Sequence, residues 1–419
     1  MYLAANGRPD APPRPAGVRR RVPGTVIALG AVSLVTDVSS EMVTAVLPLY
    51  LVLGLGLSPL QFGFLDGLFN GATALVRLLG GRLADRGGRH KRVAGAGYLL
   101  SALSRLGLLL AGGAAGGIAA ALAADRLGKG IRTAPRDALI SLSGPPETLG
   151  RSFGVHRAMD TTGALLGPLV ALAVLWATAD AYDAVFVVSF CVGLLGVLLL
   201  VLYVPDVAAG PAARTAPVKH RPLRDPAFRR ILYAACLLGA ATIGDAFLYL
   251  LLQRGLDLSP TLFPLLPLGA AAGYLLLAVP AGRIADRAGR RVPFLCGHAA
   301  LLGAYAVLLA PVSWTTLVLV LALLGIFYAA TDGVLMALAG PVLPAHGRAS
   351  GFAILQTGQA LARLVGAAGF GAAWTFWGQG PALWVAAFAL AAALVAAWRV
   401  LPAPGTTPQP PTDPAPEAP

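Results

Sequence analysis

The chain has 419 residues, of which 57% are hydrophobic and only 12% charged, and its net charge is +13. A soluble globule of this size cannot bury so much apolar surface, so the composition excludes an ordinary soluble protein and points to a lipid bilayer as the solvent. The excess of cations alone would also suit a nucleic-acid surface, and their distribution decides between the two.

The predicted elements begin with a Pro- and Arg-rich segment, residues 1–24, which we expect to be a cytoplasmic tail. The apolar run behind it is too long for a signal peptide, so the first helix is expected to stay as an anchor. Mostly apolar runs of this length predict transmembrane helices, and they are too long for barrel strands. Twelve such runs follow one another: Val26–Leu53, Gln61–Gly81, Val93–Ala111, Ile118–Leu142, Arg151–Trp176, Ala184–Val204, Arg230–Leu252, Thr261–Ile284, Val292–Ala310, Thr315–Leu338, Ala349–Phe376 and Ala382–Leu401.

The chain is expected to consist of two similar halves. Residues 205–228 are rich in Pro, Ala and cations and predict a cytoplasmic linker between six-helix bundles at 25–204 and 229–401, while residues 402–419 predict a disordered cytoplasmic tail. The stretch GGRLADRGGRHKR (80–92) returns as AGRIADRAGRRVP (281–293), each between the second and third helix of its half. The predicted fold is therefore an all-α integral membrane protein of twelve transmembrane helices, in two bundles related by a pseudo-two-fold axis along the membrane normal.

The cations gather on one side of this topology. They lie in the amino-terminal tail, both repeated loops and the linker, and only Arg254 falls outside the helices on the opposite side. The positive-inside rule then places both termini in the cytoplasm of a multi-pass protein of the cell (inner or plasma) membrane, and no nucleic-acid partner is expected. Cys191, Cys236 and Cys296 are scattered through apolar helices, so we expect no metal site, no cofactor and no enzyme activity.

Acidic side chains inside the helices are the first candidates for function. Asp37 and Glu41 lie on one face of the first helix, and Asp245 and Asp332 lie well inside helices of the second half. A carboxylate at this depth needs a wet cavity, a cation or a proton, so we expect all four to line a substrate cavity and to take part in proton coupling. A polar pair in the second helix, Asp66 and Asn70, is expected in the cavity or as a contact between helices.

The fourth and fifth helices carry the other candidates. Arg126 and Lys129 are expected to lie deep and to require a cavity, whereas Arg132, Arg136 and Asp137 are expected to approach the cytoplasm, where long side chains can snorkel. Arg157 and Asp160, three residues apart in the fifth helix, predict an internal ion pair with a structural or a coupling role. Together with Lys129 they are also expected to line the substrate cavity.

Three motifs resemble those of the major facilitator superfamily. GRLADRGGRHKRV (81–93) resembles its helix 2–3 loop motif G-x-L-a-D-r-x-G-r-k, and LAADRLGKG (122–130) resembles its helix 4 motif l-x-x-x-R-x-x-q-G, with Lys129 in place of the Gln. The fifth helix follows the spacing of the superfamily's antiporter motif, although Ala171 and Leu172 replace its closing glycines. The matching positions are Gly81, Asp85, Arg86, Gly88, Arg89, Gly282, Asp286, Arg287, Gly289 and Arg290 in the two loops, and Gly154, Gly163, Gly167 and Pro168 in the fifth helix.

Wider stretches, such as DRLGKGIRTAPRDALIS and FGVHRAMDTTGALLGPL, resemble a poorly characterised bacterial and archaeal branch of the superfamily. The resemblance implies that the loop motif is a latch of the outward-facing state and that Arg126 takes part in proton transfer. In physical terms the loop glycines permit close backbone approach, and Asp85 can cap a helix or pair with an arginine in a contact that breaks when the halves rock.

Together these features predict a monomeric secondary active transporter in the bilayer, with a small-molecule substrate and protons as its partners. We expect proton-coupled antiport that exports a small organic solute or drug by alternating access. The acids favour a cationic or amphiphilic substrate, while the basic pair of the fourth helix leaves an anionic one open. The alternatives are proton-coupled uptake of a metabolite and a transporter-like receptor that moves nothing.

Overall fold

The protein is described here from a computed structural model that covers residues 21–49, 73, 75–86, 88–112, 114–179, 181–206, 222–258 and 265–401. Within these ranges every regular element is an α-helix or a short 3-10 helix. The first half contains a helix at residues 75–85 and α1 (Gly24–Leu49), α3 (His90–Ala111), α4 (Ala115–Leu142), α5 (Leu149–Ala177) and α6 (Tyr182–Tyr203). The second half contains α8 (Pro226–Ala240), α9 (Asp245–Gly255), α10 (Leu265–Ala288), α11 (Arg291–Leu308), α12 (Trp314–Ala339), α13 (Arg348–Trp377) and α14 (Gln379–Val400).

The described helices follow the predicted runs closely, and eight of them are long and apolar enough to cross a membrane by length and composition. The charged helix α4 is not among these eight, because six acidic and basic residues lie in it from Asp125 to Asp137. The domain limits proposed above stay predictions. In the structure α8 already begins at Pro226, inside the predicted linker.

The prediction that the seventh helix is continuous over Arg230–Leu252 is wrong. The structure breaks it between α8 and α9, at residues 241–244. The freed backbone groups find other partners at the break: the Ile243 N–H donates to the Tyr305 hydroxyl at 2.7 Å. Gly366 of α13 allows close approach of the chain at the break, because a Cβ at this position would lie only 2.4 Å from the Ala240 carbonyl oxygen. A broken helix is therefore tolerated because neighbouring helices satisfy it.

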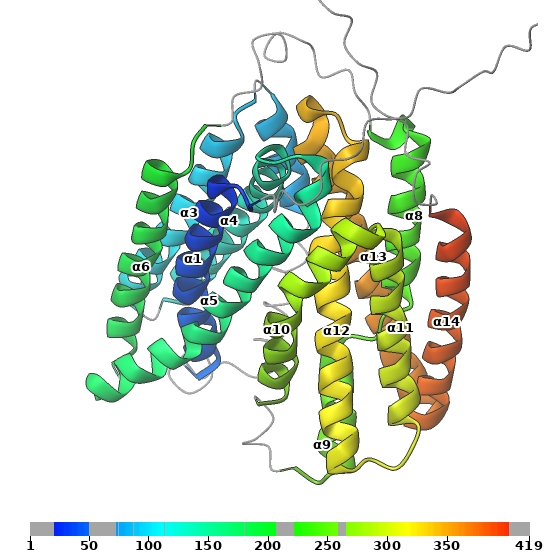
Figure 1. Cartoon of the computed structure of the whole chain (residues 1–419). Helices are drawn as coiled ribbons and strands as arrows, with labels where there is room; N and C mark the ends of the chain where they lie inside the picture. The colour runs from blue at the N-terminus through cyan, green and yellow to red at the C-terminus, as the bar shows by residue number, and fades with distance from the viewer. Residues whose placement is uncertain are drawn as a thin grey trace, which may run out of the picture.

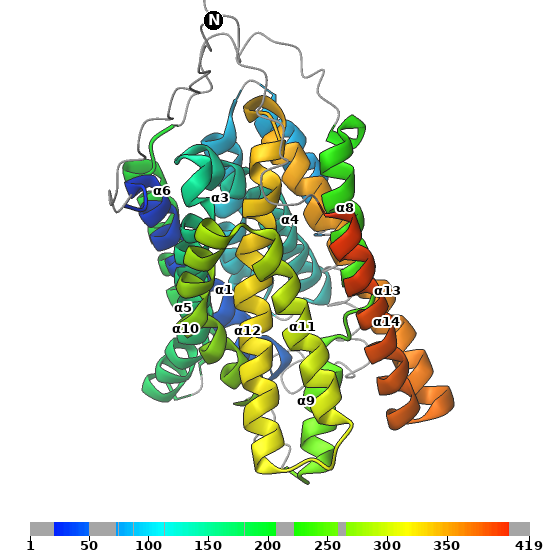
Figure 2. The same cartoon turned by 45° about the vertical axis from the view of Figure 1, so that its right-hand side comes forward.

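The two halves form two bundles that meet along α5 and α10 (Figure 1). Turning the molecule shows α10 and α12 in front of α5 and α1, so the second bundle faces the first over much of its length (Figure 2). Helix α5 touches both halves, since it packs against α1 in its own half and against α10 in the other.

Glycines allow α5 to approach α1 and α10 closely. A Cβ on Gly163 would lie 2.3 Å from the Leu34 carbonyl oxygen, and one on Gly167 would lie 2.5 Å from the Glu41 Cβ, both on α1. A Cβ on Gly154 would lie 2.6 Å from the Ala278 carbonyl oxygen on α10. Small residues that bring helix backbones together are the common packing device in membranes. Three positions of the antiporter-like pattern thus seat α5 against both helices.

The close packing of α5 against α1 predicts a cost for any side chain at Gly163. We expect Gly163→Ala to lower the free energy of unfolding by about 1–3 kcal/mol, because the new Cβ meets backbone that cannot move away cheaply. The matched control is Gly369→Ala in α13, where a Cβ meets nothing within 4 Å. Thermal unfolding of both variants in detergent measures the difference, and an equal melting temperature for the two would contradict this packing.

Candidate functional site

The repeated loop motifs each cap a helix of the opposite half. The Ala349 and Ser350 N–H groups, in the first turn of α13, donate to Asp85 at 3.2 and 2.7 Å. In the second copy, the Gly150 and Arg151 N–H groups in the first turn of α5 donate to Asp286 at 2.7 and 2.8 Å. A carboxylate here satisfies N–H groups that have no partner within the helix and also meets the positive end of the helix dipole. The contact is reciprocal between the two halves.

The motif glycines make this contact possible. A Cβ on Gly81 would lie 2.7 Å from the Ala349 carbonyl oxygen, and one on Gly282 would lie 2.3 Å from the Gly150 carbonyl oxygen. Gly88 and Gly289 turn the chain with φ of +64° and +85°, a region that favours glycine. We call the end of the molecule that holds both loops the motif end.

Arginines add further ties between the halves at the motif end. Arg348 donates from Nη1 to the Ser141 carbonyl at 3.2 Å, and Arg290 donates to the Pro146 carbonyl. Arg290 also lies 3.8 Å from Asp286. The remaining motif cations, Arg86, Arg89 and Arg287, make none of the described contacts between the halves. The two bundles are thus bonded together at the motif end by polar groups.

A cavity of about 600 Å³ lies between the two halves. It draws residues from α1, α4, α5, α12, α13 and the helix at 75–85, which makes it an interface of both bundles. Its charged lining consists of Asp37, Glu41, Asp160 and Asp332, together with Arg77, Lys129, Arg132, Arg136, Arg157 and Arg363. A volume of this size suits a small organic molecule.

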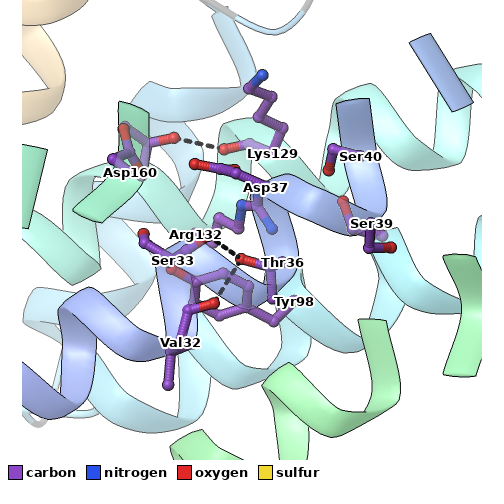
Figure 3. Close-up of polar contacts among 12 residues, drawn as sticks. Val32, Ser33, Thr36, Asp37, Ser39, Ser40, Tyr98, Lys129, Arg132 and Asp160 are labelled. Atoms are coloured by element: carbon purple, nitrogen blue, oxygen red, sulfur yellow. Dashed lines mark hydrogen bonds and ion pairs between the residues drawn. The ribbon is translucent and has the colours of Figure 1, made fainter. Parts of the chain in front are cut away.

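Two carboxyl groups face each other on the first-half wall of the cavity. Asp37 of α1 and Asp160 of α5 are neighbours on this wall (Figure 3). Arg132 of α4 approaches Asp37 at 3.5 Å, and its guanidinium also lies 4.5 Å from the centre of the Tyr98 ring. An ionised carboxylate is only an acceptor, so a hydrogen bond between two carboxyl groups requires one of them to hold a proton. This pair can therefore store a proton beside a cation.

A second cluster closes the cavity toward the motif end. Asp137 of α4 is 0% exposed. It pairs with Arg136 at 3.1 Å and Arg157 at 3.6 Å and accepts a hydrogen bond from Gln356 of α13 at 2.5 Å. Arg157 reaches across the interface to Asp332 of α12 at 3.1 Å. Polar contacts at the centre of the protein thus join the halves a second time.

Several predicted residues lie together in the cavity, and others do not. Asp37, Glu41, Lys129, Arg157, Asp160 and Asp332 all line it. Arg126 does not, and lies instead beside a small pocket of about 20 Å³ near the Arg105–Asp125 ion pair, whose atoms are 3.0 Å apart. Asp245 begins α9 and accepts a hydrogen bond from Tyr328 within the second half, outside the cavity lining. Asp66 and Asn70 lie outside the described residues.

The expectation that the long side chains of Arg132 and Arg136 snorkel toward the cytoplasm is wrong, while the depth of Arg132, Arg136 and Asp137 in the membrane stays a prediction. Arg132 and Arg136 are 3% and 5% exposed and line the cavity. Acids of α1, α4 and α5 hold these arginines inside, so they have no need to snorkel. Arg126 and Lys129, which were predicted to share one deep face of α4, line different spaces. Lys129 lines the cavity between the halves, and Arg126 lines the small pocket.

Sequence reasoning did not single out Arg77, Arg363 or Gln356 as cavity residues. Arg77 and Arg363 are cations inside otherwise apolar runs, and such placement is itself a usable indication of a functional site. Nothing in the sequence indicates that Gln356 would meet Asp137, because that contact depends on how α13 crosses α4. No group of three or more potential metal ligands occurs among the residues that the structure describes.

The family model and a curated relative that match this sequence belong to the same superfamily. The family model described as Major Facilitator Superfamily matches residues 29–273 and 246–419. An uncharacterised MFS-type transporter of the archaeon Methanocaldococcus jannaschii is 35% identical over 181 residues, which is 43% of this chain and 45% of that protein. The match thus spans less than half of this curated relative.

Solved structures share the fold. FucP, the fucose:proton symporter of E. coli, solved in the outward conformation, superposes with a TM-score of 0.70 at 13% identity, covering 89% of this chain and 98% of that one. The human organic anion transporter MFSD10 gives 0.69 at 15% identity, covering 89% and 99%. The predicted all-helical fold of two six-helix membrane bundles is confirmed by these similarities.

The reciprocal caps predict that the motif end opens when a capping carboxylate is weakened. We expect Asp85→Asn combined with Asp286→Asn to lengthen the distance between spin labels on Glu147 and Ala288, two exposed positions on opposite halves. Losing charge-assisted hydrogen bonds of about 1.5–3 kcal/mol each shifts the population toward separated halves. Asp183→Asn, an exposed acid at the far end of α6, serves as the control. Unchanged distances in the double variant would show that the caps do not hold this end.

Proposed function

The chain belongs to the major facilitator superfamily, and on that basis we propose that it is a proton-coupled secondary transporter that moves a small organic solute by alternating access. The observation that carries this proposal is the facing pair Asp37 and Asp160 on the wall of a cavity that both halves enclose. A shared proton next to a solute cavity is the element that couples the two movements. The family and the structural neighbours are transporters rather than enzymes.

The alternating movement would proceed between the two sets of contacts described above. With the motif end toward the cytoplasm, as the distribution of cations suggests, closed caps correspond to an outward-facing state. Opening toward the cytoplasm requires the caps on α5 and α13 to break, together with the Arg157–Asp332 contact across the interface. All of these are polar contacts, which water or a solute can replace at modest cost.

Two more specific proposals differ in whether the proton moves against the solute or with it. Antiport with export is favoured by the resemblance of the α5 glycines and Pro168 to the superfamily's antiporter motif. Co-transport with uptake follows from the Arg132–Asp37 contact, because a proton on Asp37 would free Arg132 to hold a solute. The two are separable in proteoliposomes whatever the orientation of the protein, since a solute entering by antiport makes the lumen alkaline and one entering by co-transport makes it acidic.

Replacing the first member of the carboxyl pair tests the coupling itself. We expect Asp37→Asn to lower solute-driven proton movement at least about tenfold, because an amide cannot release a proton. The measurement uses a pH-sensitive dye in the lumen and a panel of ethidium, tetraphenylphosphonium, succinate and glucose 6-phosphate. Asp183→Asn should behave as the wild type.

Folding of the Asp37→Asn variant is checked by its elution from a size-exclusion column. A folded variant that moves protons as fast as the wild type would refute Asp37 as a proton carrier. A wild-type protein that binds a member of the panel and moves neither solute nor protons would instead favour the receptor alternative.

A further inference from the structure

The cavity between the halves carries more positive than negative charge. Six cationic and four acidic side chains line it. The acids are largely engaged: Asp160 and Asp332 contact Arg157 at 3.4 and 3.1 Å, and Asp37 lies between Asp160 and Arg132. Only the Glu41 carboxylate makes no described hydrogen bond or ion pair. Asp137, just below the lining, is already satisfied by Arg136, Arg157 and Gln356.

Three of the cations have no such partner. Arg77, Lys129 and Arg363 form no hydrogen bond or ion pair through their cationic side chains in the part of the chain that the structure describes, although all three line the cavity. The Nε atoms of Arg77 and Arg363 are buried without a hydrogen-bond partner. In Figure 3 the Lys129 side chain extends away from both Asp37 and Asp160. The three side chains are partly buried, and they leave the cavity lining with an excess of positive charge. An anion from outside the protein would balance this charge.

We infer that the cavity takes a small organic anion with at least one carboxylate or phosphate group, held by Lys129 and Arg77 of the first half and Arg363 of the second. Guanidinium groups suit both kinds of oxyanion, because their paired N–H groups match two oxygens at once. This assignment replaces the cationic substrate that the acids of the sequence favoured.

The position of the three cations also gives the anion a mechanical role. Arg363 comes from α13 and the other two from the first bundle, so an anion between them draws the two halves together. Without it, like charges face one another across the cavity and oppose closure. The anion thus lowers the cost of the closed, occluded arrangement that transport must pass through.

The assignment also fixes the sign of the proton coupling, and this step rests on the proposed function. A proton on Asp37 removes a negative charge from the cavity and releases Arg132, so it strengthens the binding of an anion, and the anion in turn strengthens the binding of the proton. The charged or titratable groups near Asp37 come from five elements. They are Glu41 on α1, Tyr98 and Arg105 on α3, Lys129, Arg132 and Arg136 on α4, Arg157 and Asp160 on α5, and Arg77 at 75–85. Anion and proton therefore move in the same direction, as in co-transport.

Binding to the full-length protein in lipid nanodiscs tests the assignment without any gradient. The probes are succinate and citrate as carboxylates, glucose 6-phosphate as a phosphate ester, tetraphenylphosphonium and ethidium as organic cations, and maltose as a neutral solute. We expect saturable binding of at least one anion, seen as a rise in melting temperature. Its Kd should increase about tenfold or more in Lys129→Gln and in Arg363→Gln, because each removes a buried charged contact. The control Arg230→Gln, at an exposed position of α8, should leave the Kd unchanged.

The outcomes separate the substrate class from the proton coupling. If only cations or maltose bind, if no anion of the panel binds, or if folded Lys129→Gln and Arg363→Gln bind the anion as the wild type does, the anion assignment is wrong. Lys129→Arg keeps the charge and should keep binding, which guards against loss of folding in the Gln variant. After correction for protonation of the probe itself, the binding should be tighter at pH 5.5 than at pH 8 in the wild type, and equal at both in Asp37→Asn. Anion binding without this pH dependence would sustain the cavity assignment and overturn the coupling.

Discussion

A carboxylate that is wholly buried at the centre of a membrane protein has to be satisfied from every side. Asp137 is such a group, and it draws Arg136 from its own helix, Arg157 from α5 and Gln356 from α13. Because these partners come from both bundles, one buried charge fixes how α4, α5 and α13 meet. The packing of α4, α5 and α13 therefore sets the shape of the neighbouring cavity and places cations in its lining. Asp332, contacted by Arg157, belongs to the same network.

The two bundles are bonded to each other at two levels, and polar groups serve at both. At the motif end Asp85 and Asp286 each cap a helix of the other half. At the centre Arg157 reaches Asp332 and Gln356 reaches Asp137. Apolar contacts such as the edge-to-face pair of Phe153 and Phe352, with centroids 6.2 Å apart, fill the space between the two levels. Hydrogen bonds and ion pairs can be exchanged for water or solute, which is what a protein that opens alternately at its two ends requires.

Much of this architecture could be read from the sequence, and the reasons are physical. Apolar runs of membrane-spanning length fix the helices, and the repeated loop with Gly81 and Asp85 indicates two related halves and a contact at their cytoplasmic ends. The break in the seventh helix was not predicted, because residues 241–244 look no less apolar than their surroundings. Its stability comes from Tyr305 and Gly366, which lie far away in the sequence.

The site was less accessible to prediction, since helix periodicity gives the face of a residue but not its partner. Asp37 was expected beside Glu41, whereas its carboxyl faces Asp160 of another helix. Arg126 was expected to need a cavity because of its depth in the fourth helix, whereas Lys129 and Arg132 of α4 line the cavity and Arg126 does not. The sign of the cavity's charge also depends on which cations are already paired, and only the three-dimensional arrangement shows that Arg77, Lys129 and Arg363 are not.

The central claim is that the facing carboxyl groups of Asp37 and Asp160 share a proton. Infrared difference spectroscopy of the protein in lipid measures this directly, because a protonated carboxyl group has a C=O stretch separate from that of a carboxylate. The account predicts a protonated-carboxyl band near neutral pH that disappears in Asp37→Asn and is retained in Asp183→Asn. A spectrum without such a band in the wild type, or a band that Asp37→Asn leaves unchanged, would contradict it.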